Sequence, residues 1–134
     1  MAKPAILTVD DDPAVLQSIT RDLRSRFGDD YQIVRASSGA DALKLLGDFA
    51  TRGRQVALIA SDQRMPEMNG VEFLREVRRR PEMARLPIVL TTSEAEGSEL
   101  LAAAKRLGVS ATVKKPWHPQ QLRDLVDATC GHQP

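Results

Sequence analysis

The stretch ILTVDDDPAVL, residues 6–16, decides the expected fold. Its apolar start is typical of a buried strand, and three consecutive carboxylates, Asp10, Asp11 and Asp12, follow with a proline directly after them. An Asp at position 12 can accept the first N–H groups of a helix, and Pro13 suits the first helical position because no donor is needed there. The stretch therefore predicts a strand that turns at once into a helix, with acidic side chains at the turn.

The alternation of strand and helix continues along the whole chain. Apolar runs, most of them apolar on both faces, predict strands over residues 5–9, 31–36, 56–61, 87–92 and 111–114. The first helix has apolar residues at helical spacing: Leu16, Ile19, Leu23 and Phe27. Similar spacing predicts helices over residues 39–49, 69–80, 97–108 and 119–129. The order (βα)5 predicts an α/β doubly wound sandwich with helices on both faces of a parallel sheet.

Composition limits the chain to one domain and few classes of function. It has 134 residues, a hydrophobic content of 42% and a net charge of +1, which disfavours a general binder of nucleic acid or membrane surfaces. Cys130 has no second cysteine to pair with, and no apolar run approaches the ~20 residues of a membrane span. We expect one cytoplasmic domain over residues 1–134, with its core at about 3–128 and a short tail at 129–134.

Polar residues stand where the expected strands end. In doubly wound sheets these carboxyl ends meet at one edge, where functional groups gather. The residues concerned are Asp10, Asp11, Asp12, Asp62, Thr92, Ser93 and Lys115. Clustered carboxylates without Cys or His favour a hard cation, and Mg²⁺ fits because it binds a few carboxylates and keeps exchangeable waters. The sequence therefore predicts a site for Mg²⁺ and an anion, with a lysine and a threonine as further donors.

Four segments together resemble the receiver domains of two-component response regulators. They are ILTVDDDP, ASDQRMPEMNGVEFL, LPIVLTTSEA and VKKPW, and the resemblance extends from about Lys3 to Ala128. It implies a flavodoxin-like fold with a five-stranded parallel sheet of order 2-1-3-4-5. It also implies that Asp62 is the phosphoacceptor. The further positions implied are the Mg²⁺ ligands Asp10, Asp11, Asp62 and the backbone carbonyl of Arg64, and the phosphoryl contacts Thr92 and Lys115.

The resemblance also implies partners and a mode of action. The phosphodonor would be a phosphohistidine on a sensor histidine kinase or a histidine phosphotransfer protein. The domain would be a phosphorelay switch that accepts and hydrolyses its own aspartyl phosphate, rather than an enzyme for a separate substrate. The surface of the fourth helix, fifth strand and fifth helix would report the change to a downstream protein and could form a homodimer. The chain would act alone or as the N-terminal part of a longer regulator.

Four positions depart from the family or individualise this chain. Thr112 stands where the family often has an aromatic residue that switches rotamer, so a ring flip there is not expected. Trp117 is either a replacement reporter or an ordinary packing residue. Arg64 and Glu94, two residues beyond the phosphoacceptor and the threonine, are hypothesised to pair and to control the access of water to the phosphoryl group.

Other interpretations of the same residues remain open at this point. Asp10 and Asp12 form a D-x-D pair typical of some metal-dependent phosphatases, and a receiver-like interaction module need not be phosphorylated at all. Asp10, Asp11 and Asp62 could also be solvated side chains at strand ends. The arginine-rich segment 75–85 reads as a solvated helix end rather than a nucleic-acid site, since no aromatic residues accompany it. Asn69 and Glu72 resemble a capping box, and Gly70 reads as a turn glycine.

Overall fold

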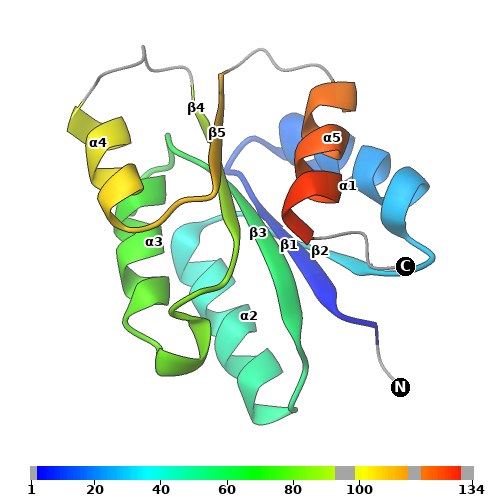
Figure 1. The fold of residues 1–134 in the computed structure, drawn as a ribbon, viewed down its shortest axis with the longest axis horizontal. Helices are drawn as coiled ribbons and strands as arrows, with labels where there is room; N and C mark the ends of the chain where they lie inside the picture. Colours follow the sequence, from blue (N-terminus) through cyan, green and yellow to red (C-terminus); the bar gives the residue numbers. More distant parts are fainter. Residues whose placement is uncertain (1–2, 93–98, 115–118, 131–134) are drawn as a thin grey trace.

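A computed structural model describes residues 3–92, 99–114 and 119–130. Strands and helices alternate along these residues (Figure 1). The strands are β1 (Ala5–Val9), β2 (Gln32–Ala36), β3 (Val56–Asp62), β4 (Ile88–Thr92) and β5 (Ala111–Lys114). The helices are α1 (Pro13–Phe27), α2 (Gly39–Thr51), α3 (Gly70–Arg78), the 3-10 turn η1 (Pro81–Met83), α4 (Glu99–Arg106) and α5 (Pro119–Cys130).

All five strands are parallel and follow the order β2-β1-β3-β4-β5. The predicted fold is therefore confirmed. Sheet order reverses between β1 and β3, because β1 pairs with β2 on one side and with β3 on the other. A reversal of this kind leaves a crevice at the carboxyl ends of the two central strands. The predicted acids of the first and third strands lie at this crevice.

The helices form two layers, with α1 and α5 on one face of the sheet and α2, α3 and α4 on the other (Figure 1). The central strands β1 and β4 are buried along their whole length, whereas the edge strand β2 contains exposed, intermediate and buried residues. Two apolar clusters fill the space between the layers. One contains Leu23 and Phe27 of α1, and the other contains Phe73 and Leu74 of α3.

The starts of two helices agree with the caps predicted from sequence. The Asp12 side chain accepts the N–H groups of Ala14 at 3.0 Å and Val15 at 3.4 Å, which confirms its role as N-cap of α1. In α3, Asn69 and Glu72 form a reciprocal capping box with bonds of 2.8 and 2.9 Å. Both helices therefore begin where these polar side chains fix them, directly beside the carboxyl ends of the strands.

The sequence did not predict η1, and it misjudged Gly70. Gly70 is the buried first residue of α3 rather than part of a turn. A Cβ added there would lie 2.7 Å from the carbonyl oxygen of Asp62 and 2.9 Å from Cα of Gln63. Glycine is therefore required because the helix approaches the end of β3 too closely for any side chain. Within the described residues, no helix combines the length and apolar character needed to cross a membrane.

Candidate metal site

The register of the parallel strands brings the predicted acids together. Val9 of β1 pairs with Ser61 of β3, so Asp10 and Asp62, one residue further on, lie side by side. Asp62 in turn pairs with Thr91 of β4, and Thr92 follows at the same edge. Parallel strands end at one side of the sheet, and this is why residues fifty positions apart in sequence converge.

Asp10, Asp11 and Asp62, here called the acid cluster, each offer a carboxylate oxygen within 4.8 Å of the others. Asp10 is 1% exposed and Asp62 is 5% exposed, so these two are not solvated strand-end acids. Asp11 is exposed. At such separations two carboxylates repel by about 3 kcal/mol at an effective dielectric of about 20. The arrangement is therefore one that a divalent cation would stabilise, and oxygen ligands of this kind suit Mg²⁺.

Asp12 does not belong to the acid cluster, although it is adjacent in sequence. Its side chain caps α1 and is exposed, and its own N–H donates to Oδ1 of Asp10 at 2.9 Å. The backbone of Asp12 thus orients the Asp10 carboxylate, while its side chain faces away from the site toward the helix. Three consecutive acids divide their roles in this way, with two in the cluster and one at the helix start.

Arg64, whose backbone carbonyl is the fourth predicted metal ligand, opens a six-residue loop over residues 64–69. Its side chain is exposed. Further along, Met65 is buried, and Glu67 has a positive φ of 68°. A positive φ is unfavourable for a glutamate, and such strain is characteristic of functional loops. The loop therefore begins two residues after Asp62 of the acid cluster, and it contains one residue, Glu67, with an unfavourable backbone conformation.

Thr92 is the described member of the predicted phosphoryl contacts. It ends β4 and is 2% exposed. Lys115 lies outside the described residues, as do Ser93, Glu94 and Trp117, so the predicted lysine contact and the Arg64–Glu94 pair remain predictions. Thr112 is exposed on β5, opposite Leu90 of β4. No aromatic side chain is available at that position.

Two arginines of the arginine-rich segment differ from the solvated helix end that the sequence indicated, whereas Arg75, Arg79 and Arg85 are exposed as expected. Arg78 donates to the carbonyl oxygens of Leu107 and Met83 at 2.9 Å and of Gly108 at 3.0 Å. Burial lowers the pKa of Arg78 from its ordinary value, and the three acceptors offset that desolvation. Arg80 donates to the carbonyl of Leu43 at 3.3 Å. These two arginines hold the fold together instead of facing solvent or a nucleic acid.

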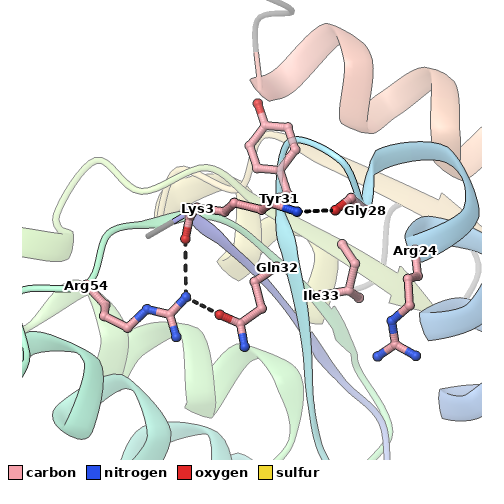
Figure 2. A pocket seen from close by; sticks show the side chains of 7 residues that line it. All are labelled: Lys3, Arg24, Gly28, Tyr31, Gln32, Ile33 and Arg54. Carbon is pink, nitrogen blue, oxygen red and sulfur yellow. Dashed lines mark hydrogen bonds between the residues drawn. The ribbon is translucent and has the colours of Figure 1, made fainter. Parts of the chain in front are cut away.

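A hollow of about 570 Å³ lies at the opposite, amino edge of the sheet. Lys3, Arg24 and Arg54 line it, and Figure 2 shows Lys3 and Arg54 turned toward neighbouring backbone and side-chain oxygens. Lys3 donates to the carbonyl of Gly28 at 2.9 Å, and Arg54 donates to the carbonyl of Lys3 at 3.2 Å and to Gln32. Lys3 and Arg54 thus bind main-chain carbonyls on neighbouring segments, which gives these two cations a structural role.

Comparison with known proteins agrees with this geometry. The sequence pattern of the response regulator receiver domain matches residues 6–127. A CheY homolog, a chemotaxis protein of Campylobacter jejuni, is 32% identical over 125 residues, which cover 93% of this chain and 92% of that protein. The solved chemotaxis protein CheY4 of Vibrio cholerae has a TM-score of 0.81 at 26% identity and covers 96% of this chain and 99% of its own.

A third similar protein was solved with a metal ion. The receiver domain of a sensor histidine kinase from Pseudomonas aeruginosa has a TM-score of 0.78 at 25% identity, covering 97% of this chain and 99% of its own. Its structure holds a magnesium ion coordinated in the active-site cleft. Fold, sequence pattern and acid cluster thus lead to the same family from independent directions.

Proposed function

The chain belongs to the response regulator receiver domain family, which serves phosphorylation-based two-component signalling, and we propose that Asp62 is its phosphoacceptor. The observation that carries this proposal is the acid cluster at the crevice of the sheet, with carboxylate oxygens within 4.8 Å of one another. Asp62 is the member that ends the central strand β3. Its backbone pairs with Thr91 of β4, and the preceding Ser61 pairs with Val9 of β1, so its carboxylate has a defined position.

In the proposed reaction, a carboxylate oxygen of Asp62 attacks the phosphorus of a phosphohistidine on a sensor histidine kinase or histidine phosphotransfer protein. The new O–P bond forms as the N–P bond breaks, and the histidine nitrogen keeps the electron pair and takes up a proton. Mg²⁺, when held by Asp10, Asp11, Asp62 and the carbonyl of Arg64, would neutralise charge on the phosphoryl oxygens. Thr92 would donate a hydroxyl hydrogen bond, and Lys115 would supply a positive charge.

Phosphorylation would then act as a switch. It adds negative charge and strong acceptor oxygens beside the buried Thr92, at the end of the strand next to β5. We infer that α4, β5 and α5 form the surface that a downstream protein or a second copy of the chain reads. The absence of a ring at Thr112 means that this readout proceeds without the aromatic flip common in the family.

The test is the intact mass of the protein after incubation with acetyl phosphate and Mg²⁺. We expect a gain of one phosphoryl group that requires Mg²⁺ and that Asp62→Asn abolishes. Asp12→Asn is the matched control, because it neutralises the neighbouring acid while asparagine still caps α1. The control should be phosphorylated like the unsubstituted protein. No gain under any Mg²⁺ concentration would favour a phosphate-independent interaction module, and equal gain in Asp62→Asn would place the acceptor elsewhere.

A further inference from the structure

Gln63, the residue directly after Asp62, is buried at the end of β3 and is only 2% exposed. We propose that Gln63 is a positioning residue that fixes the loop 64–69 and thereby sets the affinity of the site for Mg²⁺. The inference rests on the proposed function, since that function assigns the carbonyl of Arg64 to the metal. Gln63 itself would touch neither the metal nor the phosphoryl group.

Three hydrogen bonds make Gln63 the junction of the loop. Its N–H donates to the carbonyl of Thr91 at 2.8 Å, which ties it to β4. Its carbonyl accepts the N–H of Gly70 at 2.9 Å, and its side-chain Oε1 accepts the N–H of Val71 at 3.0 Å. The residue before the loop is thus bonded to the two residues after it, once through the main chain and once through the side chain.

These bonds also satisfy the start of α3. The first N–H groups of a helix have no partner inside it and must find one elsewhere. The N–H groups of Gly70 and Val71 use Gln63, and the N–H of Glu72 uses the Asn69 side chain at 2.8 Å. A glutamine side chain is long enough to reach Val71 and supplies the acceptor oxygen that an apolar side chain of similar size lacks. Position 63 therefore needs a side chain with an acceptor oxygen as well as the right length.

The opposite side of the loop is held by close packing. A Cβ added to Gly39, the first residue of α2, would lie 2.8 Å from Sδ of Met68, so this glycine makes room for the loop. Met65, which belongs to the same loop, is also buried. With packing on one side and the Gln63 bonds closing its ends, the position of the Arg64 carbonyl depends on Gln63. Groups that orient a metal ligand typically change metal affinity by 10–100-fold when they are removed.

The experiment compares Mg²⁺ binding by the unsubstituted protein and Gln63→Met, followed by amide NMR signals near the acid cluster. Methionine keeps the length and the burial but removes the acceptor for Val71. We expect Mg²⁺ to bind about tenfold more weakly. The rate of phosphorylation by acetyl phosphate should return to within about twofold at saturating Mg²⁺, because the positioning role concerns affinity and not the attack itself.

A matched control separates positioning from general destabilisation. Thr20→Val removes another buried polar side chain, which donates to the carbonyl of Leu16 at 2.7 Å within α1 and away from the loop. It should lower stability and leave Mg²⁺ affinity unchanged. Asn69→Ala, which opens the capping box at the far end of the same loop, should weaken Mg²⁺ binding in the same direction, and it serves as the test if Gln63→Met does not fold.

Mg²⁺ affinity within twofold of the unsubstituted protein in the variants that fold would overturn the proposal. So would a phosphorylation rate that stays low at saturating Mg²⁺, because Gln63 would then act on the chemistry. The proposed function fails separately. An unsubstituted protein that binds Mg²⁺ but never gains a phosphoryl group refutes phosphorylation, while weaker Mg²⁺ binding by Gln63→Met would still support the positioning role.

Discussion

At the carboxyl edge of the sheet, three carboxylates, two of them buried, lie close to one another, whereas at the amino edge the cations donate to separate main-chain carbonyls. The acid cluster places its oxygens within 4.8 Å of one another. Lys3, Arg54 and Arg78 at the amino edge donate to carbonyl oxygens of three different connections between helices and strands and of the segment before β1. Helices of this fold end at the amino edge with unpaired carbonyls and a partial negative charge, which attracts cations. We expect charge at the amino edge to stabilise the fold and repulsion among the acids at the carboxyl edge to oppose it.

Backbone strain follows the same division. Gly53 and Gly108, both at the amino edge, have φ values of +67° and +81°, which glycine adopts without steric cost. At the carboxyl edge, among the residues that the structure describes, Glu67 has a positive φ. The amino edge thus has glycines at its positive φ values and a relaxed backbone. The carboxyl edge retains repulsion between carboxylates and backbone strain at Glu67, which a binding site can use. The size of a hollow is a poor guide here, since the hollow of about 570 Å³ lies at the relaxed edge.

The largest effect is expected for Asp10→Asn. Asparagine keeps the acceptor for the N–H of Asp12 but removes one charge from the acid cluster. We expect Mg²⁺ to bind at least about 100-fold more weakly, or about 2.7 kcal/mol, because one of the few anionic ligands is lost. Without Mg²⁺, the free energy of unfolding should rise by about 1 kcal/mol as repulsion falls.

Urea unfolding with and without Mg²⁺ measures both effects of Asp10→Asn in one series. In the unsubstituted protein, Mg²⁺ should raise the free energy of unfolding, since it binds only the folded state. Asp12→Asn should keep that response. If Asp10→Asn lowers stability in the absence of Mg²⁺, the acids support the fold and the contrast between the two edges is wrong.

An intermediate effect is expected for Arg78→Ala at the amino edge. It removes three hydrogen bonds of 2.9–3.0 Å and leaves partly buried carbonyls without a donor. The free energy of unfolding should fall by about 2 kcal/mol, with Mg²⁺ affinity unchanged. Arg78→Lys should recover only part of the lost free energy of unfolding, because an ammonium cannot span the acceptors that the planar guanidinium reaches.

The neighbouring Arg79 is the control for this prediction. It is exposed and pairs with Glu76 at 3.3 Å on the helix surface, so Arg79→Ala should change stability by less than about 0.5 kcal/mol. Urea unfolding of the three variants checks the ranking. Equal stability of Arg78→Ala and Arg79→Ala would show that the carbonyl bonds contribute nothing.

The sequence predicted the carboxyl edge better than the amino edge, and the reason is physical. Strand bounds were correct to within a residue because buried parallel strands are apolar on both faces, and their ends converge whatever the details of packing. The hydrogen bonds of Gln63 and Arg78 were missed. Whether a polar side chain turns toward a main-chain group is decided by tertiary packing. In the run Arg78, Arg79, Arg80, nothing in the local pattern separates the arginine with three carbonyl partners from its exposed neighbour.

The smallest effect is expected for Glu67→Asn in the loop beside the acid cluster. Asparagine tolerates a positive φ better than glutamate, so the free energy of unfolding should rise by about 0.5 kcal/mol. Glu67→Gln is the control, since it removes the same charge but keeps the unfavourable backbone. If both variants gain equally in urea unfolding, the cost at this edge comes from charge near the acid cluster. If only Glu67→Asn gains stability, the cost comes from the backbone conformation of residue 67. Repulsion between the acids and backbone strain are then two separate destabilising contributions at this edge.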